Sequence, residues 1–322
     1  MDIPFNGFIR AAVERAPDQF WWVIGGILAF LGVASAIGWW LGKRTPSATI
    51  DNLNSRIKAW WVMVVVLCVC FVIGKTATLV LYAILSFLAL REFITLTPTQ
   101  KGDHLALCLC FYIAIPVQYY LIGIEWYGLF VIFIPVYGFL LLPAITALAG
   151  DTSNFLERST KIQWGLMLTV FCLSHAPALM LLNIPGYEGQ NLMLLFYLLL
   201  IVQMSDVLQY VFGKLFGKRL LAPQVSPSKT VEGLIGGGLA ATALGTALYW
   251  ITPFTPLQAA GLSAMIVACG FLGGLALSAV KRSLGAKDWG QMIDGHGGIL
   301  DRLDSVVFAA PIFFHVVRYN FQ

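Results

Sequence analysis

Charge is scarce in this sequence. Only 11% of its 322 residues are Asp, Glu, Lys or Arg, whereas about a quarter of the residues of a soluble domain are charged. Apolar residues make up 59% of the chain, and long apolar runs recur along its length. About 20 apolar residues cross a bilayer as a helix, and a lipid-exposed backbone must satisfy its own hydrogen bonds. The sequence therefore predicts an all-α, polytopic transmembrane helix bundle.

Several signals are absent, and each absence excludes a class of protein. The six cysteines all lie in apolar runs and none has zinc-ligand spacing, so we interpret them as packing residues. No soluble basic domain is present to bind nucleic acid, and no P-loop pattern occurs. The first apolar run begins near Phe20 without a basic leader, so we expect no cleaved signal. No internal repeat of roughly 20 to 50 residues is found, which argues against a repeat-built transporter.

Hydropathy predicts nine or ten spans along the chain. They lie near residues 20–42, 59–74, 77–96, 104–122, 126–149, 162–182, 191–212, 233–251, 257–280 and 303–320. The second span is short in this prediction. We expect residues 1–190 to form the N-terminal transmembrane helices and residues 191–322 to form a catalytic membrane region with polar loops at 213–232 and 281–302.

The distribution of basic residues predicts the orientation. If both termini are external, all Lys and Arg residues fall on the inner side except Arg10, Arg15, Lys75 and Arg318. Basic residues concentrate in cytoplasmic loops, so both long polar loops are predicted to be cytoplasmic. We expect an integral protein of a bacterial inner membrane whose active site faces the cytoplasm.

Asp206 and the polar loop after it form the first candidate constellation. Asp206 lies inside an apolar run, where an acid is costly unless it is paired, hydrated or bound to a cation. It is either a helix-end acid that reaches the interface or a functional group, and the basic loop that follows favours function. The groups in this loop that suit a phosphate are Lys214, Lys218, Arg219, Ser226, Ser228, Lys229, Thr230 and the glycines at 236–238. Ser-Lys-Thr is equally consistent with an ordinary helix N-cap.

The stretch Lys281–Ser305 gathers acids and bases around two glycines. Asp301 and Asp304 are three residues apart, so a helix that begins there places both carboxylates on one face, near its positive end. Such a pair can hold Mg²⁺ and leave positions open for substrate phosphates. Gly297 and Gly298 permit close backbone approach, and the basic residues can neutralise a polyphosphate. His104, His175 and His315 have no catalytic partners in sequence, so we interpret them as packing or interface residues.

The order of these residues forms a long pattern. It runs Ser278-x-Val280-Lys281-Arg282-x4-Lys287-Asp288-x-Gly290-x2-Ile293 and continues as His296-Gly297-Gly298-Ile299-x-Asp301-Arg302-Leu303-Asp304. This pattern resembles the signature of CDP-diacylglycerol synthases, also called phosphatidate cytidylyltransferases. The segment FGKLFGKRLLAPQVSPSKTVEG resembles another segment of that family, and the likeness covers roughly residues 200–305.

The resemblance implies a membrane enzyme that condenses CTP with phosphatidic acid, or a related lipid phosphate, to CDP-diacylglycerol and pyrophosphate. It implies a Mg²⁺ cofactor held by Asp301, Asp304 and Asp288. The implied catalytic residues are Asp206, Lys281, Asp288 and Asp301. The implied substrate-binding residues are Ser226, Lys229, Thr230, Arg282, Lys287, His296, Gly297, Gly298 and Arg302. The resemblance also implies a homodimer, for which the sequence shows no interface motif.

One departure from the family pattern touches the predicted metal site. Four residues before Ser278 the family has an acid that resembles a metal ligand, but this chain has Gly274. We expect altered turnover, or a replacement ligand at Asp294. Three alternatives stay open: a CTP-dependent transferase or kinase acting on another lipid such as a polyprenol, a catalytically degraded nucleotide-binding partner, and a lipid transporter. A transporter would place paired charges near the bilayer midplane and show related halves.

Overall fold

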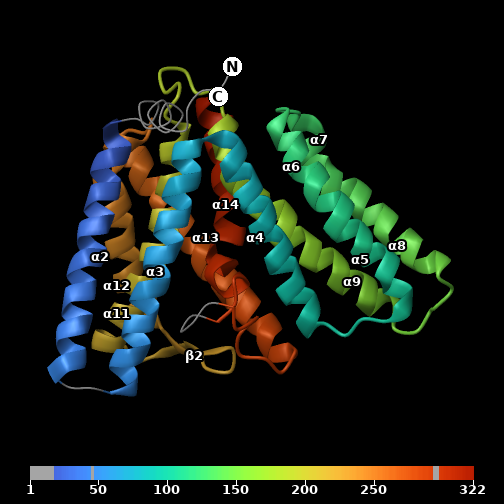
Figure 1. The fold of residues 1–322 in the computed structure, drawn as a ribbon, viewed down its shortest axis with the longest axis horizontal. Coiled ribbons are helices and arrows are strands. Elements are labelled where there is room, and N and C mark those ends of the chain that lie inside the picture. Colours follow the sequence, from blue (N-terminus) through green and yellow to red (C-terminus); the bar gives the residue numbers. More distant parts are fainter. Residues whose placement is uncertain (1–17, 45–46, 293–296) are drawn as a thin grey trace, which may run out of the picture.

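Long helices make up almost all of the structure, a computed structural model that describes residues 18–44, 47–292 and 297–322 (Figure 1). The first three helices are α2 (Asp18–Arg44), α3 (Ala48–Ile73) and α4 (Lys75–Leu96). The next stretches are η1 (Lys101–Asp103), α5 (His104–Leu109), η2 (Cys110–Ala114), α6 (Ile115–Gly123), α7 (Tyr127–Ile132), η3 (Phe133–Gly138) and α8 (Phe139–Leu148). They are followed by α9 (Phe155–Leu166), η4 (Met167–Cys172), α10 (Leu173–Ala178) and η5 (Leu179–Leu181). The C-terminal part contains α11 (Asn191–Phe216), α12 (Val231–Ala247), η6 (Tyr249–Ile251), α13 (Pro256–Ser283) and α14 (Leu300–Phe321).

Eight helical stretches in the described residues are long and apolar enough to cross a membrane. The shorter apolar helix α12 and the more polar α14 complete the ten predicted spans. The prediction of an all-α polytopic bundle is therefore confirmed. The division of the chain at residue 190 stays a prediction.

The second predicted span is wrong in length. We predicted residues 59–74, whereas α3 has 26 residues and begins at Ala48. The Ser47 side chain caps this helix by accepting a hydrogen bond from the Ile50 N–H, which lets its polar first turns continue into the apolar run. Asn54 in this polar part donates from Nδ2 to the Gly38 carbonyl of α2 at 3.2 Å, so the extra turns pack on a neighbouring helix.

Three of the long stretches contain a π-helical segment, which widens one turn of the helix. These segments are η2, η3 and η4. Each lies close to or contains a proline: Pro116, Pro135 and Pro177, respectively. Proline lacks a backbone N–H and clashes with the preceding turn, so a wider turn accommodates it inside a helix.

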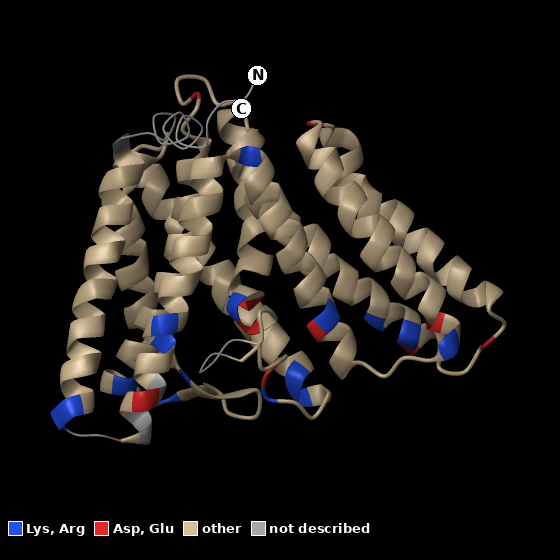
Figure 2. Cartoon of the chain, viewed as in Figure 1, with Lys and Arg blue, Asp and Glu red and all other residues tan. Residues whose placement is uncertain are grey.

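The charged residues collect at one end of the bundle. Figure 2 shows Lys and Arg gathered at the end that carries β2, with few at the other end, where the C-terminal residue lies. The same end carries the connection between α11 and α12, in which β1 (Leu220–Ala222) and β2 (Ser226–Thr230) pair antiparallel. The sequence analysis did not predict this hairpin. Helices pack in neighbouring pairs, α11 along α12 and α13 along α14, and so bring distant polar segments together.

The glycines at 236–238 have a packing role. They lie within α12, where helical hydrogen bonds use their N–H groups, so they are not a phosphate loop. A Cβ at Gly237 would lie 2.4 Å from the backbone of Gln209 in α11, and one at Gly236 would lie 2.4 Å from the Phe212 ring. Small residues let helix backbones approach closely in a membrane, which explains the run.

Arg158 at the start of α9 is part of a buried charge cluster that holds two connections together. Its Nε lies 3.2 Å from Asp103 Oδ1, and the two side chains are 5% and 0% exposed. Its Nη1 lies 2.7 Å from Asp151 Oδ2 in the exposed α8–α9 connection. Hydrogen bonds from Ser153, and then from Arg158, lower the pKa of Asp151 to about 2, so this carboxylate stays ionised at neutral pH.

We predict that Arg158→Met is strongly destabilising. Removal of one partner of a buried ion pair leaves the other charge uncompensated, which costs about 3–5 kcal/mol. The matched control is Lys161→Met, which breaks the exposed Lys161–Glu157 pair of the same helix and should cost only about 0.5 kcal/mol. Unfolding temperatures of the purified proteins in detergent compare the two, and equal decreases would contradict the structural role of Arg158.

Candidate active site

The two polar segments on either side of α12 and α13 meet in the structure. Arg282 at the end of α13 donates from Nε to the Val225 carbonyl of the hairpin turn at 3.3 Å. β2 also contacts α11, α12 and α13. The residues predicted from both segments therefore share one region of the bundle.

A buried ion pair lies at the centre of this region. Lys281 Nζ is 2.6 Å from Asp301 Oδ1, and the two residues are 8% and 7% exposed. The second oxygen of Asp301 accepts hydrogen bonds from the backbone N–H groups of Trp289, at 2.8 Å, and Gly298, at 2.9 Å. Both carboxylate oxygens of Asp301 thus have partners, and they tie α13, the connecting loop and α14 to one another.

Glu92 of α4 is a site residue that sequence reasoning missed. It is 5% exposed, and its Oε1 and Oε2 accept hydrogen bonds from the N–H groups of Ile299 and Leu300, each at 2.9 Å. These N–H groups belong to the start of α14, where free donors and the helix dipole attract a negative charge. The next residue, Phe93, stacks on Trp289 of the same loop. A polar residue at the end of an apolar run was the only signal in the sequence.

The double glycine of the pattern is explained by these contacts. Gly297 has φ +82°, a left-handed conformation that glycine adopts without strain. A Cβ on Gly298 would lie 2.4 Å from Glu92 Oε2, and one on Gly290 would lie 2.7 Å from Glu92 Oε1. The loop therefore needs glycine both to turn and to close around the Glu92 carboxylate.

Asp206 and Asp304 form a second acidic group beside this loop. Ser305 Oγ donates to Asp206 Oδ2 at 2.9 Å and lies 3.4 Å from Asp304 Oδ1, which also accepts from the Ser305 N–H at 2.7 Å. Both acids are partly buried. Within the described residues, no ion pair joins either acid to a Lys or Arg. Ser305, like Glu92, was not among the predicted site residues.

Two basic groups lie near these acids with unused donors. Lys229 and Arg302 are within electrostatic reach of both Asp206 and Asp304. Arg302 Nε is buried without a hydrogen-bond partner, and Lys229 has no ion pair among the residues that the structure describes. Burial lowers the pKa of Lys229, whereas Asp206 and Asp304 act in the opposite direction. Buried donors nearly always have partners in folded proteins, so this pair of cations is suited to an anionic ligand.

A side chain at position 274 would extend into the same cluster. A Cβ at this position would lie 3.0 Å from Lys229 Nζ, 3.5 Å from Ser305 Oγ and 4.0 Å from Asp304 Oδ2. An acid at residue 274 would therefore stand among the candidate metal-binding groups, and in this chain the Lys229 ammonium lies beside the space instead.

The remaining predicted residues lie at the edge of the site or outside the described part. Lys287 and Asp288 are on the exposed loop after α13, with Asp288 near Gly297. Ser226 begins β2, and Thr230 caps α12 by accepting a hydrogen bond from the Gly233 N–H at 3.0 Å. The helix-cap interpretation of Ser-Lys-Thr is thus correct for Thr230. His296 and Asp294 lie outside the described residues.

The carboxylates of Asp206 and Asp304 are better placed to bind a magnesium ion than the carboxylate of Asp301. Mg²⁺ in phosphate-transfer sites binds one or two carboxylates together with substrate phosphates and water. Asp206 and Asp304 each retain a carboxylate oxygen for which the described residues supply no hydrogen bond. Both carboxylate oxygens of Asp301 already accept hydrogen bonds. No cluster of three or more His, Cys, Asp or Glu residues occurs in residues 18–44, 47–292 and 297–322. The protein would therefore hold the ion through Asp206 and Asp304.

This site geometry agrees with the comparison of the chain with known families. The model of the cytidylyltransferase family matches residues 54–320, so the chain belongs to that family. The match extends well beyond residues 200–305, where the resemblance was visible in sequence, and it includes Glu92.

Individual relatives agree with this assignment. The chain is 41% identical over 299 residues to the uncharacterized protein YnbB of Escherichia coli strain K12, covering 91% of this chain and 96% of that protein. It is 28% identical over 271 residues to the phosphatidate cytidylyltransferase of Bacillus subtilis strain 168, covering 83% and 98%. The phosphatidate cytidylyltransferase of Staphylococcus aureus strain COL is 36% identical over 157 residues, which cover 48% of this chain and 60% of that protein.

We predict that Glu92→Gln disorders the loop that carries the signature. The carboxamide puts an NH₂ group against a backbone N–H and loses hydrogen bonds to a charged acceptor, each of which contributes about 1.5–3 kcal/mol. Cytidylyl transfer should fall at least about tenfold and the unfolding temperature should decrease. Arg91→Gln, which changes the exposed neighbour on α4, is the control and should leave both unchanged. Wild-type values for Glu92→Gln would show that this carboxylate does not position the loop.

Proposed function

We propose that the protein is a membrane nucleotidyltransferase that condenses CTP with phosphatidic acid, yielding CDP-diacylglycerol and pyrophosphate. The observation that carries this proposal is a pair of cationic groups, Lys229 and Arg302, for which the described residues supply no ion-pair partner and which lie beside the acids Asp206 and Asp304. Phosphate oxygens would supply the missing partners. The names of the Bacillus subtilis and Staphylococcus aureus relatives support this choice of substrates.

The reaction requires two anions to be brought together. An oxygen of the lipid phosphate forms a bond to the α-phosphorus of CTP while the bond from that phosphorus to the bridging oxygen breaks, and pyrophosphate leaves with the electron pair. Catalysis of such a transfer consists mainly of alignment and charge neutralisation. Lys229 and Arg302 would hold phosphate oxygens, and Lys281 and Asp301 would keep the loop in place around them. Mg²⁺ bound at Asp206 and Asp304 would add positive charge beside the leaving group.

We place this site on the cytoplasmic side of a bacterial inner membrane. The basic residues collect at the same end as the site (Figure 2), as the positive-inside rule requires of cytoplasmic loops. The hairpin with Lys229 and the end of α13 with Lys281 also lie at that end, which favours an enzyme that uses a soluble nucleotide over a lipid transporter. Asp206 lies deeper, near the middle of α11. The predicted homodimer has no test in a single chain and stays a prediction.

Gly274 favours one second candidate, a family member that binds nucleotide as a partner subunit with little or no turnover. The missing carboxylate would weaken binding of a second cation. A CTP-dependent enzyme acting on a polyprenol or another lipid is the remaining alternative for the same site.

The direct test is a purified-protein assay with CTP and Mg²⁺. The protein is offered phosphatidic acid, lysophosphatidic acid or a polyprenol, and products are identified by mass. We expect CDP-diacylglycerol from phosphatidic acid, and a product from the polyprenol alone would overturn the proposed substrate. Nucleotide binding without pyrophosphate release under any condition would favour the partner subunit.

We predict that Asp301→Asn lowers pyrophosphate release by at least about 100-fold. The change removes the negative charge that compensates Lys281, so the buried ammonium loses its ion-pair partner. The hydrogen bonds that hold the loop before α14 are weakened as well. Glu157→Gln, at an exposed acid of the same end, is the control and should keep wild-type activity. The unfolding temperature is measured for both variants. A folded Asp301→Asn protein with normal turnover would contradict the role of the ion pair.

We predict that Gly274→Asp increases pyrophosphate release, by about tenfold, or ~1.4 kcal/mol in the barrier. The new carboxylate would extend toward Lys229 and Asp304 and add a third acid to the candidate metal site. The nearest atom is the end of the flexible Lys229 side chain, so the substitution is accommodated easily. Gly274→Asn has the same shape without the charge and should show no gain. Equal rates for the Asp and Asn variants would count against the missing-ligand explanation.

A further inference from the structure

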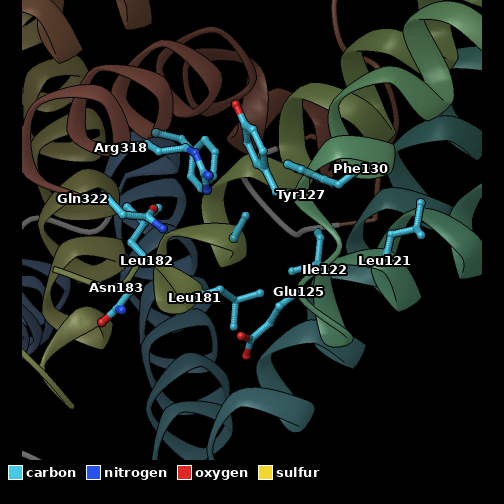
Figure 3. Close-up of a pocket in the computed structure, with 12 residues that line it drawn as sticks. Leu121, Ile122, Glu125, Tyr127, Phe130, Leu181, Leu182, Asn183, Arg318 and Gln322 are labelled. Carbon is cyan, nitrogen blue, oxygen red and sulfur yellow. The ribbon is translucent and has the colours of Figure 1, made fainter.

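A cavity lies at the end of the bundle opposite the candidate active site. It has a volume of about 180 Å³ and is formed where the α6–α7 turn, the segment after α10 and the last turns of α14 meet. Figure 3 shows Arg318 and Tyr127 on one side of this cavity and Glu125 on the other. The rest of its wall is largely apolar and includes Leu121, Ile122, Leu181 and Phe314. None of the residues assigned to nucleotide transfer lies here.

Arg318 is the cationic group of this cavity. Its guanidinium lies over the Tyr127 ring, 3.4 Å from the ring centroid, and no ion pair joins it to a carboxylate within the described residues. Glu125 lines the same cavity but pairs with Lys75 at 2.8 Å. Within the described residues Arg318 therefore has no ion-pair partner and can bind an anion, and the Glu125 carboxylate of the same cavity is paired with Lys75.

A line of polar side chains continues from Arg318 into the bundle. The Tyr127 hydroxyl is 3.4 Å from His315 Nδ1, and the His315 ring lies 5.1 Å from that of His175. His175 is fully buried, and its Nε2 has no hydrogen-bond partner in the described residues. It packs on Phe130 and Phe314, which line the cavity. His175 therefore brings one ring nitrogen without a described partner close to the cavity wall, whereas His315 is exposed.

The size and lining of the cavity restrict the ligand. Clefts for drug-sized molecules have volumes of about 300–1,000 Å³, so a space of about 180 Å³ suits a headgroup and not a whole nucleotide. The leucine and isoleucine side chains of the wall suit an acyl chain next to the anion. The exposed Trp126 and Tyr120 beside the cavity are typical of the headgroup level of a membrane. These features favour a lipid phosphate over a free phosphate ion.

We propose that this cavity binds the phosphate headgroup of a membrane phospholipid, with Arg318 as the group that binds the phosphate. The acyl chains lie along the apolar wall formed by α6, the segment after α10 and α14. The site is separate from the candidate active site and binds lipid of the opposite leaflet, so it does not depend on the proposed nucleotidyl transfer.

The test compares lipid binding by the full chain and an Arg318→Gln variant. Each protein is purified in detergent and delipidated, and its unfolding temperature is followed during addition of phosphatidylglycerol, diacylglycerol or inorganic phosphate. Only phosphatidylglycerol should give a stabilisation of the wild-type protein that is weakened in Arg318→Gln. Loss of one cation at a headgroup should weaken binding, so in Arg318→Gln the lipid concentration that gives half of the maximal rise in unfolding temperature should be about fivefold higher.

Lys161→Gln is the matched control. It removes one positive charge from an exposed ion pair on α9, and Lys161 does not line the cavity, so the lipid response should equal that of the wild type. Arg318→Lys keeps the charge and loses the planar fork, and it should respond between the wild type and Arg318→Gln. If Arg318→Gln does not fold, Arg318→Lys serves in its place, and a wild-type response would then overturn the proposal.

Other outcomes are equally decisive. An identical response of Arg318→Gln and wild type, or equal stabilisation by diacylglycerol, would show that no phosphate binds at Arg318. Stabilisation by inorganic phosphate that Arg318→Gln removes, with no such effect for phosphatidylglycerol, would identify a soluble anion site in place of a lipid site. Pyrophosphate release at saturating substrate should be unchanged in Arg318→Gln, which separates this result from a failure of the proposed function.

Discussion

Burial of the Lys281–Asp301 pair is the constraint on which the rest of the polar end depends. Two charges can leave water only if every donor and acceptor keeps a partner. Asp301 meets this condition through Lys281 and two backbone N–H groups of the preceding loop, so the loop must wrap around the start of α14. Glu92 then accepts hydrogen bonds from the N–H groups of Ile299 and Leu300 at that helix start. The signature of the family therefore contains a set of mutually satisfied contacts around Asp301, together with groups such as Arg302 Nε that have no partner in the described residues and that we propose bind substrate.

Hydropathy was sufficient to predict the bundle because each crossing is a local property of about 20 residues. It failed for the polar first turns of α3, where a Ser47 cap and packing on α2 extend the helix. The candidate site was predicted only from its contiguous part. Glu92 is 207 residues from its partner Ile299, and no periodicity or spacing links positions so far apart. Ser305 and the β1–β2 hairpin were missed for a related reason, because tertiary contacts decide their roles.

The acidic cluster shows how one missing side chain changes the chemistry of neighbouring residues. With glycine at 274, the Lys229 ammonium has room beside Asp304 and also lies over the Phe271 ring. A carboxylate there would compete for the same ammonium. The balance of charge among residues 206, 229, 274 and 304 therefore decides whether positive charge at this position comes from a side chain or from a bound cation.

One helix carries groups at both ends of the molecule. α14 has Asp301, Asp304 and Ser305 in its first turns and Arg318 in its last, and its 22 residues give a length of about 33 Å. The hydrocarbon layer of a bilayer is about 30 Å thick, so this one helix is long enough to carry polar groups to both surfaces. Any shift of α14 along its axis would move its carboxylates relative to Asp206 on α11 and would move Arg318 by the same amount. The two polar ends of the molecule are therefore joined through a single helix.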